Sequence, residues 1–408
     1  MFKNHEVKKK TCRLCKSKNL ELVYKFNQSP IGDNYLKIKS KKKLYDLMLM
    51  LCKKCNFVQL SNVIDPKVVY GNYIYVTKTS HGLSEHFQKL TYNLIKREIV
   101  KKNGKVLEIG SNDGTLLNFL KKKSELVVAV DPAAHLFKDK HVENISALFS
   151  NKLAIKISKS HGKFDTIIAN NVLANIDDLD DIFLGIQKLL NYSGHLVIET
   201  FSLYGVLKNN LIDNVYHEHL SYFTIPSLKK FAKKYGLNLK SVDFLNVKGG
   251  SYRFIFQNKN LKNTLKISKL IKRDKKITGK IKSNFKKLQK INLENTKKVT
   301  NFLDKQIKNK KKIAGFGASV GTTTLVYDMG LKSKIDCLYD NEKRRFNLYC
   351  PGTEIKVLNP KNIKKNKIDY LVIFAWRYAE VILKRNKKLF DKKTKFILPH
   401  PKFKILKN

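Results

Sequence analysis

The sequence has no long apolar run and few acidic residues or arginines. No stretch approaches the roughly 18 consecutive apolar residues of a membrane span. The first six residues, Met1 to Glu6, lack the apolar core of a signal peptide. These absences argue against a membrane protein and lead us to expect a cytoplasmic one.

The chain is strongly basic, because its 82 Lys and Arg outnumber its 33 Asp and Glu and give a formal net charge of +49. Only eight of these cations are arginines, and the lysines are spread along the whole chain. Arginine supplies the bidentate contacts with phosphate and guanine that nucleic-acid-binding proteins use. The scarcity of arginine therefore favours a solvated lysine surface over a nucleic-acid-binding face, although the positive field would still attract a small diphosphate substrate.

Cysteine is scarce too, with six in the chain, yet four of them form two C-x-x-C pairs. Each pair can present two thiolates from a tight knuckle, and two pairs complete a tetrahedral zinc site. A disulfide framework is not expected in a cytoplasmic chain, and redox chemistry does not need two such pairs. Because thiolates fill all four positions, the predicted zinc is structural and has no open position for catalysis. The predicted ligands are Cys12, Cys15, Cys52 and Cys55.

A chain of 408 residues is long for a single core, and two or three domains are expected. From about residue 83 to residue 256, strand-like and helix-like segments alternate, which favours a parallel α/β sheet covered by helices on both faces. The predicted strands are 105–110, 127–131, 164–169, 195–201 and 250–256, and the predicted helices include 179–190 and 227–235.

Residues 260–312 contain one Gly and no Pro. Apolar residues recur there at steps of four and three, which predicts an amphipathic helix or a pair of helices. These apolar positions are Ile277, Ile281, Phe285, Leu288 and Ile291.

A short apolar run at 106–109 leads into a glycine turn that opens a helix, an arrangement that binds nucleotides. The next apolar run ends in Asp131, and an acid at the tip of the second strand suits the two hydroxyls of a ribose. The spacing is not G-x-G-x-x-G, and carboxylates at the turn would repel a pyrophosphate. The pattern therefore predicts a phosphate-free, positively charged nucleoside, with a ligand-free strand-turn-helix as the simpler alternative. The turn residues are Glu108, Gly110, Asn112, Asp113 and Gly114.

Further along the chain, another strand-like segment is followed by a turn that contains Gly315, Gly317 and Gly321. A later strand-like segment ends in Asp340. The spacing G-x-G-x-x-x-G departs by one residue from the dinucleotide fingerprint, so an NAD site and an oxidoreductase function are weakly supported. A phosphate resting on the backbone amides of the following helix is the better interpretation. A domain that serves only as a scaffold remains the alternative.

The segment Tyr216-His217-Glu218-His219 concentrates two imidazoles, a carboxylate and a phenol just after the predicted strand 195–201. Ligands meet an open α/β sheet at the carboxyl ends of its strands. A histidine with a pKa near neutrality can remove a proton from a carbon next to a carbonyl, and a nearby glutamate can orient it. The spacing lacks the i, i+4 arrangement of a helical metal site. The segment therefore predicts an acid–base centre, with plain hydrogen-bonding residues as the alternative.

The glycine turn and its acid resemble the S-adenosylmethionine (SAM) site of the seven-strand methyltransferases. Over essentially its full length, the chain also resembles the three-domain C-methyltransferases that act on nucleotide-linked deoxy-keto-sugars. The motifs that carry this resemblance occur in one order along the chain. They are the two cysteine pairs, 55–60, Tyr73-x-Tyr75, 108–114, 131–133, 170–174, 216–219, 249–253, 315–318 and 351–353.

This resemblance implies an α/β fold with a central seven-strand Rossmann-like methyltransferase sheet, an N-terminal zinc-binding domain and a C-terminal Rossmann-like α/β domain. It implies a structural zinc ion, and SAM held by the turn residues together with Asp131 and Asn170. His219 would be the general base, with Tyr216 and Glu218 beside it. The residues implied to line the sugar-nucleotide cleft are Tyr75, Ser251 and Arg253.

The reaction implied is removal of a proton from C3 of a 4-keto-deoxysugar and transfer of a methyl group to that carbon, while phenols and amide N–H groups stabilise the oxyanion. The expected partner is a small nucleotide-sugar substrate, and we expect a monomer with no membrane partner. The domains are predicted at 1–80 (zinc-binding), 81–258 (SAM-binding methyltransferase), 259–311 (helical connector) and 312–408 (Rossmann-like).

Two positions depart from the family pattern. Asn175 stands where a histidine is common, and Gly321 lies near a position where many relatives carry a lysine. These departures leave the sugar open and keep O-methylation of a nucleotide sugar or glycan precursor as an alternative. A zinc-containing nucleic-acid-binding protein is the other alternative, and a steep salt dependence of polynucleotide binding would reveal it.

Overall fold

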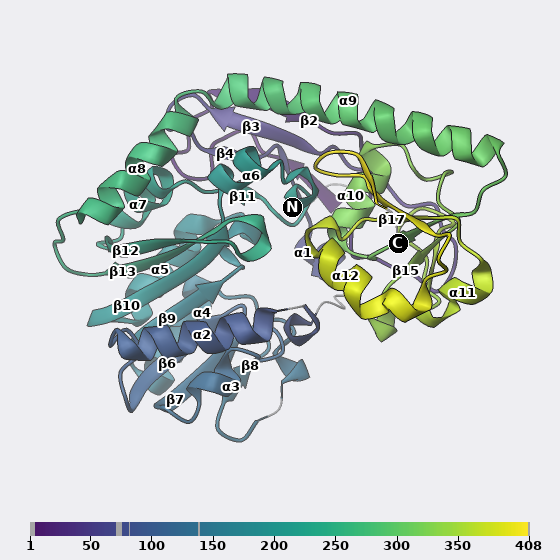
Figure 1. The fold of residues 1–408 in the computed structure, drawn as a ribbon. Helices are drawn as coiled ribbons and strands as arrows, with labels where there is room; N and C mark the ends of the chain where they lie inside the picture. Colours follow the sequence, from purple (N-terminus) through teal and green to yellow (C-terminus); the bar gives the residue numbers. More distant parts are fainter. Residues whose placement is uncertain (1–4, 71–75, 81, 138, 407–408) are drawn as a thin grey trace.

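The computed structural model describes residues 5–70, 76–80, 82–137 and 139–406. A seven-stranded, a six-stranded and a four-stranded sheet dominate this part of the chain, and a small two-stranded sheet accompanies them (Figure 1). No helix in the described ranges is long and apolar enough to cross a membrane.

The seven-stranded sheet has the strand order β12-β13-β10-β9-β6-β7-β8. β13 runs antiparallel to both of its neighbours, while the strands from β10 to β8 are parallel. The five strands predicted from the sequence are confirmed, and the sheet is parallel as predicted except at β13. The strands are β6 (Gly104–Ile109), β7 (Ser124–Val130), β8 (Glu143–Ile145), β9 (Phe164–Asn170), β10 (Leu190–Phe201), β12 (Asn238–Leu245) and β13 (Ser251–Gln257).

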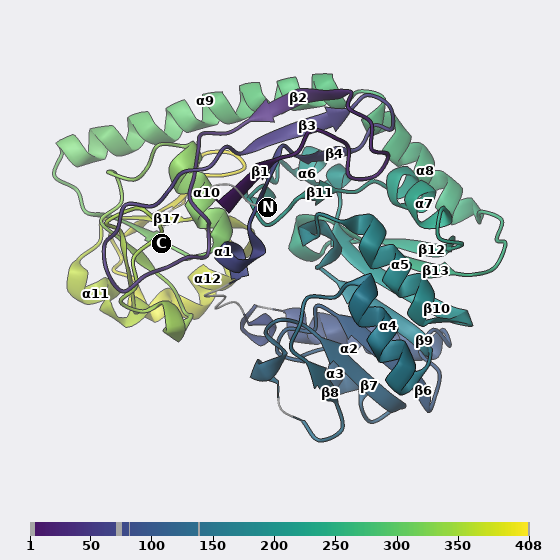
Figure 2. The ribbon, with the colours of Figure 1, turned by 180° about the vertical axis from the view of Figure 1, so that it is seen from behind.

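Helices cover both faces of this sheet, with α2 and α3 on one face and α4 and α5 on the other (Figures 1 and 2). The alternation of side chains along β6 explains this arrangement, because Val106 packs with α2 while Leu107 and Ile109 pack on the α4 and α5 side. The helices are α2 (Leu83–Lys96), α3 (Leu117–Leu120), α4 (Asn151–His161) and α5 (Leu179–Leu189).

The N-terminal region forms an antiparallel sheet of order β11-β4-β3-β2, and β1 pairs with β5 beside it. β11 belongs to the chain far beyond this region and follows the segment 216–219 by two residues, so the two parts share one sheet. The elements are β1 (Glu6–Lys8), β2 (Leu20–Lys25), β3 (Met48–Cys52), β4 (Val58–Leu60), β5 (Asn62–Ile64), α1 (Pro66–Tyr70), α6 (Leu203–Asn209), β11 (Ser221–Tyr222) and α7 (Ile225–Lys233).

The amphipathic segment predicted at 260–312 is a pair of helices, α8 (Leu265–Thr278) and α9 (Ile281–Lys308). α9 crosses the β2–β3 sheet and leads to the C-terminal sheet (Figures 1 and 2). The prediction that Ile291 lies on the buried face was wrong, since Ile291 is 40% exposed. Asn292 and Asn295 are buried instead, because Tyr24 Oη and the Pro399 carbonyl accept their side-chain N–H groups.

The C-terminal sheet has the order β16-β15-β14-β17-β18-β19, parallel except for β19 at the edge. α10 lies on one face, and α11 and α12 lie on the other. The elements are β14 (Ile313–Phe316), α10 (Val320–Asp328), β15 (Cys337–Tyr339), β16 (Lys356–Leu358), α11 (Ile363–Asn366), β17 (Tyr370–Ile373), α12 (Ala379–Asn386), β18 (Lys395–Leu398) and β19 (Lys404–Leu406).

Candidate active site

A cavity of about 1220 Å³ lies between the seven-stranded and the six-stranded sheets. The turns after β6, β7 and β9, the segment between β10 and β11, and the loops after β14, β15 and β17 all contribute to its walls. Asp33 and Tyr70 add a wall from the N-terminal region. Because parallel strands of both sheets end at this cavity, it is the natural ligand site of the molecule.

The predicted glycine turn connects β6 to α3 and depends on two left-handed glycines, Gly110 (φ +77°) and Gly114 (φ +67°). A Cβ at Gly110 would lie 2.8 Å from the Val172 Cβ, and one at Gly114 would lie 2.4 Å from the Phe137 ring. Any side chain at either position would therefore displace a neighbour. Gly110 lines the cavity, whereas Gly114 lies behind it against Phe137.

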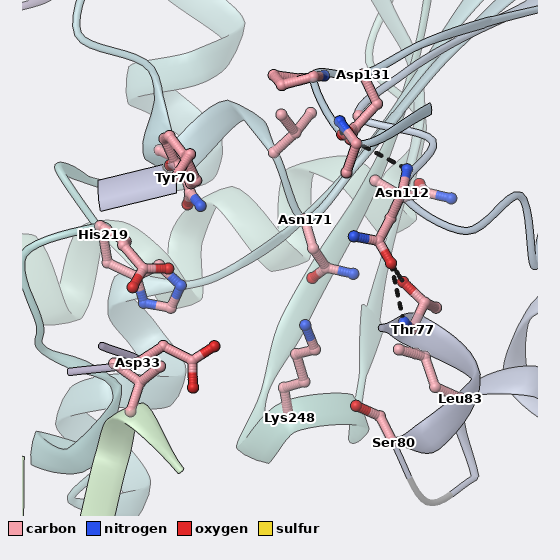
Figure 3. Close-up of a pocket in the computed structure, with 18 of the residues that line it drawn as sticks. Asp33, Tyr70, Thr77, Ser80, Leu83, Asn112, Asp131, Asn171, His219 and Lys248 are labelled. Atoms are coloured by element: carbon pink, nitrogen blue, oxygen red, sulfur yellow. Dashed lines mark hydrogen bonds between the residues drawn. The ribbon is translucent and has the colours of Figure 1, made fainter. Parts of the chain in front are cut away.

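Asp131 is fixed by the turn that it faces. Its Oδ2 accepts a hydrogen bond from the Asn112 backbone N–H at 3.0 Å, and its Oδ1 accepts one from the Ala133 backbone N–H at 2.6 Å. The Asn112 side-chain oxygen in turn accepts from the Thr77 backbone N–H at 3.0 Å and from the Thr77 hydroxyl at 3.2 Å (Figure 3). Asn112, Asp131 and Thr77 all line the cavity, so these bonds hold a polar wall in place.

Asp113, predicted to contact the cofactor, does not line the cavity. Its carboxylate accepts from the Lys78 backbone N–H at 3.1 Å and from the Thr115 hydroxyl at 2.5 Å. Asp113 therefore fastens the 3-10 turn Thr77–Thr79 to the glycine turn. Asp113 thus supports the cavity wall indirectly, by holding these two turns together.

Several buried polar atoms on the cavity wall have no hydrogen-bond partner within the described ranges. At the ends of β6 and β9 these atoms are Glu108 Oε2, the Ser111 hydroxyl and both polar side-chain atoms of Asn170. Burial, together with the carboxylates of Asp131 and Asp113, raises the pKa of Glu108 well above its ordinary value. Buried polar groups are rarely left without partners in folded proteins, so these atoms point to a polar ligand at the ends of β6 and β9.

Apolar side chains that the sequence analysis missed complete this end of the cavity. Leu148 stands 57% exposed after β8, and an exposed leucine beside a polar wall suits the face of an aromatic ring. The short strand β8 leads into Leu148 and Phe149, and its three residues leave too little pattern to detect. The missed lining residues include Thr77, Ser80, Leu83, Pro132, Leu148, Phe149, Asn171 and Ile182.

His219 is held at both ring nitrogens. Its Nδ1–H donates to the Asn214 carbonyl at 2.7 Å, and its Nε2 accepts from the Tyr216 hydroxyl at 2.8 Å. The ring centres of Tyr216 and His219 lie 3.9 Å apart. The carbonyl partner assigns the proton to Nδ1, because a carbonyl only accepts, and Nε2 therefore carries the lone pair. His219 and Tyr216 both line the cavity.

The sequence-based expectation that His219 has a pKa near neutrality was wrong. Burial lowers the pKa of His219 to about 3, and the charges of Lys248 and Arg377 lower it further, against the opposing effect of the Asn214 carbonyl. The imidazole is therefore neutral at physiological pH. The lone pair of Nε2 can therefore accept a proton without the imidazole first losing one.

Glu218 does not orient the His219 imidazole, as the sequence analysis had suggested. No hydrogen bond joins Glu218 to His219 in the described structure, and the Asn214 carbonyl is the group that orients the imidazole. Burial, with a contribution from the Asp33 carboxylate, raises the pKa of Glu218 to about 8, and its Oε1 has no partner among the described atoms. His217 does not line the cavity and packs edge-on against the Tyr45 ring.

His217 makes the stability of the fold sensitive to acid. Burial lowers the pKa of His217 from the ordinary 6.5 to about 4. The neutral imidazole therefore makes its full contribution to the free energy of unfolding above pH 6.5, and this contribution is lost as the pH falls to about 4. We expect this group alone to lower the free energy of unfolding by about 3 kcal/mol across that range. Urea titrations measure the free energy of unfolding between pH 7 and pH 4. Over this range it should fall less in His217→Gln than in the unmodified protein, by this same amount.

The exposed residue His141 supplies the control for this experiment, since His141→Gln should keep the slope of the unmodified protein. Parallel profiles for His217→Gln and the unmodified protein would contradict the assignment.

The three predicted substrate residues are not found together in the cavity wall. Tyr75 lies outside the described residues. Ser251 donates its hydroxyl to the Val247 carbonyl at 3.1 Å, and it does not line the cavity. Arg253 is also outside the cavity wall, because it donates to Glu199 Oε2 at 2.9 and 3.0 Å within the sheet.

The wall from the C-terminal region carries several paired charges. Arg345 pairs with Asp33 at 2.8 Å, and Arg377 pairs with Asp213 at 2.8 Å. The first turn of α10 also faces the cavity, where Ser319 caps the helix. A Cβ at Gly321 would lie 2.8 Å from the Asp213 carbonyl oxygen, so this close approach leaves no room for a side chain there. This wall can accommodate an anionic part of a ligand next to His219.

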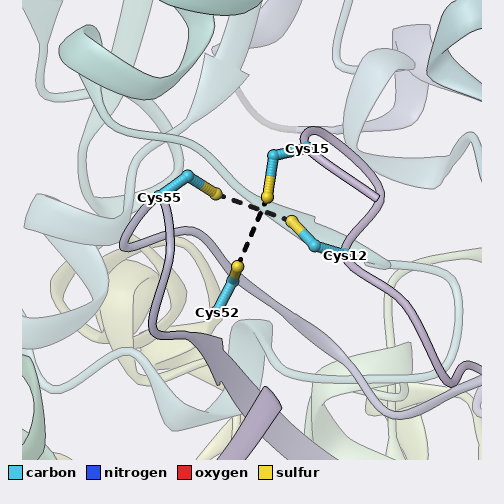
Figure 4. Close-up of side chains that lie close together, drawn as sticks. All are labelled: Cys12, Cys15, Cys52 and Cys55. Atoms are coloured by element: carbon cyan, nitrogen blue, oxygen red, sulfur yellow. Dashed lines mark hydrogen bonds between the residues drawn. The ribbon is translucent and has the colours of Figure 1, made fainter. Parts of the chain in front are cut away.

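The four predicted zinc ligands come together from two matching knuckles (Figure 4). Their sulfur atoms all lie within 4.8 Å of one another, with distances of 3.6 Å for Cys12–Cys55 and 3.5 Å for Cys15–Cys52. A tetrahedral zinc ion with bonds of roughly 2.3 Å needs sulfur atoms roughly 3.8 Å apart. The donor set and its spacing therefore fit zinc.

The zinc knuckles are connected to the cavity by hydrogen bonds and by strand pairing. Arg13, between two ligands, is 1% exposed and donates to Asp177 Oδ1 at 2.9 Å on the cavity wall. The second knuckle leads into β4, where Gln59 pairs with Ser221 of β11. The zinc site therefore fixes the strand that follows His219 by two residues.

Comparison with known proteins agrees with this division of the molecule. Family models match a zinc-binding domain at residues 12–70, a methyltransferase domain at 83–242 and a C-methyltransferase C-terminal domain at 246–401. The C-methyltransferase NovU of Streptomyces niveus is 26% identical over 404 residues, which cover 97% of this chain and 96% of that one. These matches show a SAM-dependent C-methyltransferase in which a zinc-binding, a methyltransferase and a C-methyltransferase C-terminal region follow one another. Its cofactors are SAM and a structural zinc ion.

Solved structures align with part of this C-methyltransferase. Protein PH0226 of Pyrococcus horikoshii is 18% identical with a TM-score of 0.38, and the alignment covers 47% of this chain and 98% of that one. A Burkholderia thailandensis N1-methyltransferase, solved with S-adenosylhomocysteine, is 16% identical with a TM-score of 0.33, and the alignment covers 45% and 83% of the two chains.

Proposed function

We propose that this C-methyltransferase transfers a methyl group from SAM to C3 of a nucleotide-linked 4-keto-deoxysugar. The observation that carries the proposal is the neutral His219 imidazole, which is fixed at both nitrogens and faces the same cavity as the glycine turn. An enzyme that methylates carbon next to a carbonyl needs a base of this kind, because the C–H proton must leave before carbon becomes a nucleophile.

The proposed cofactor site lies at the ends of β6, β7 and β9. Asp131 presents its carboxylate to this wall, held by the backbone N–H groups of Asn112 and Ala133, and a carboxylate there suits the two ribose hydroxyls. The partnerless atoms of Glu108 and Asn170 lie beside it, and Leu148 and Phe149 provide apolar surface for a base. When bound there, SAM supplies an electrophilic methyl group on a sulfonium. Gly110 brings the backbone close to the ligand without a side chain in the way.

His219 and Tyr216 act in this proposal as one proton-accepting pair. The proton that leaves the sugar carbon ends on Nε2, either directly or through the Tyr216 hydroxyl that already donates to it. The Asn214 carbonyl then stabilises the imidazolium through its bond with Nδ1–H. The anionic nucleotide of the substrate opposes the charges of Lys248 and Arg377, which add to the effect of burial in lowering the pKa of His219.

The proposal is tested by incubating the zinc-loaded protein with methyl-labelled SAM and a panel of nucleotide-linked 4-keto-6-deoxyhexoses. The expected product carries its new methyl on C3, which carbon–proton correlation NMR identifies. A methyl resonance on oxygen would instead establish O-methylation within the same cavity. No transfer to any keto-sugar, combined with tight polynucleotide binding of steep salt dependence, would favour the nucleic-acid-binding alternative.

Asp131→Asn is expected to weaken binding of S-adenosylhomocysteine about 10-fold in calorimetry, because an amide replaces a carboxylate that accepts from ribose hydroxyls. Asp340→Asn is the matched control, since Asp340 occupies the corresponding place after β15 and accepts from the Ala318 backbone N–H. The control variant should bind the nucleoside as the unmodified protein does. An equal loss of affinity in both variants, or a loss in Asp340→Asn alone, would contradict the assignment of the cofactor site to Asp131.

A further inference from the structure

The loop between β12 and β13 is held at four consecutive carbonyl groups. The Gly250 backbone N–H and the Ser251 hydroxyl both donate to the Val247 carbonyl. Side-chain amides of Asn214 and Asn209 donate to the next two carbonyls at 3.2 and 2.7 Å, and Ser202 donates to the fourth at 3.1 Å. A loop with every carbonyl occupied keeps one backbone conformation.

This fixed conformation is unfavourable for the residue at its centre. Lys248 has φ +50° and ψ +29°, in the left-handed region that lysine rarely adopts, and Gly249 and Gly250 follow with φ of +84° and +137°. The loop also packs tightly, because a Cβ at Gly249 would lie 2.7 Å from Leu211. Strained backbone that persists in this way is concentrated at functional sites.

The strain directs the Lys248 side chain into the catalytic cavity. Figure 3 shows Lys248 and Asn171 pointing toward one another, between His219 on one side and Thr77 on the other. Asn214 connects Lys248 to His219, since its side-chain amide binds the Lys248 carbonyl and its own carbonyl binds the imidazole. The backbone of Lys248 and the imidazole are therefore positioned by the same residue.

Lys248 differs from the arginines of the cavity in having no carboxylate partner. Arg345 pairs with Asp33, Arg377 pairs with Asp213, and Arg344 pairs with Glu342. Within the described ranges, the Lys248 ammonium makes no hydrogen bond or ion pair. Its charge also contributes to lowering the pKa of His219, in agreement with its place in the cavity wall beside the imidazole.

We propose that the Lys248 ammonium binds the carbonyl oxygen of the acceptor and stabilises the enolate that forms when His219 takes the proton. The inference rests on the proposed function. In this step the C–H electron pair becomes the carbon–carbon double bond, the carbonyl π pair moves onto oxygen, and the proton goes to Nε2 of His219. A cation next to the developing oxyanion lowers the barrier to proton removal.

The test measures proton removal separately from methyl transfer. A thymidine-diphosphate-linked 4-keto-6-deoxyhexose is incubated in D₂O with the zinc-loaded enzyme and S-adenosylhomocysteine, and NMR follows deuterium entering C3. Lys248→Met is expected to lower the exchange rate about 100-fold, the effect of losing one oxyanion donor. The KM for the sugar and the affinity for S-adenosylhomocysteine should each change less than about three-fold. Lys248→Arg should recover at least a tenth of the exchange, because it keeps the charge.

Lys280→Met is the matched control, since Lys280 is exposed on a neighbouring groove that Lys248 also lines. Unchanged exchange in Lys248→Met would overturn the inference and leave the proposed function standing. A rise in KM with an unchanged maximal exchange rate would also overturn it, because that result describes binding of the nucleotide alone. Absence of exchange in the unmodified enzyme would count against the proposed function itself.

Discussion

His219→Gln is expected to lower kcat about 1000-fold, within the range by which a positioned general base accelerates proton removal. Glutamine fills most of the imidazole volume and can still donate to the Asn214 carbonyl, but it offers no basic lone pair at the Nε2 position. Both methyl transfer from labelled SAM and deuterium exchange at C3 should fall together. Calorimetry with S-adenosylhomocysteine should give an unchanged affinity, because His219 lies at the other end of the cavity from Asp131 (Figure 3).

Two further variants make this result specific. Tyr216→Phe keeps the ring beside His219 and removes the hydroxyl that donates to Nε2, so a loss as large as that of His219→Gln would assign the proton to a relay through Tyr216. His217→Gln is the matched control at pH 7, because His217 lies two positions away and does not line the cavity. Retention of kcat in His219→Gln within a factor of three would remove His219 from the mechanism.

Removal of zinc is expected to abolish activity and to lower the melting temperature by about 10 °C or more, since structural zinc sites contribute on the order of 10 kcal/mol to folding. The effect should reach the cavity, because the second knuckle positions β4, and β4 pairs with β11 directly after His219. Loss of the knuckles also releases Arg13 from Asp177 on the cavity wall. Chelation followed by metal analysis, thermal unfolding and a methyl-transfer assay measures the three effects in one series.

Substitution of two buried cysteines distinguishes the loss of zinc from the general effect of replacing a buried cysteine. Cys52→Ser should lose zinc and activity, while Cys350→Ser, at a cysteine that is equally inaccessible to solvent, should keep both. Cys350 lies beside the Thr323 hydroxyl, which a serine there can still contact. A Cys52→Ser protein with one equivalent of zinc and full activity would contradict the assigned ligand set.

Local patterns in the sequence were sufficient for most of the architecture. Five strands of the central sheet, the helix pair α8–α9, the second Rossmann-like sheet and the cysteine knuckles follow from periodicity, glycine positions and spacing. β8 and β12 escaped detection, because one has three residues and the other has a register shift between Leu239 and Ser241. The predicted domain boundaries stay a prediction.

Burial and long-range pairing explain where the site predictions fell short. The sequence placed His219 in an acid–base centre, but its pKa depends on how many atoms exclude water around it, which spacing along the chain does not contain. Asp113 and Asp131 were both predicted to contact the cofactor, yet the Asp113 carboxylate binds outside the cavity and the Asp131 carboxylate lines it. Ser251 and Arg253 satisfy groups of their own sheet and loop.

The sequence by itself determined the zinc ligands, the glycine turn with its acid, and the residues that could carry acid–base chemistry, because each depends on residue type at short spacing. Tertiary structure alone decided that β11 pairs with β4, that Asn214 holds both His219 and the Lys248 loop, and which carboxylates face the cavity. The physical reason is that these contacts join segments far apart in the chain. Their partners, burial and pKa values exist only once the sheets have packed together.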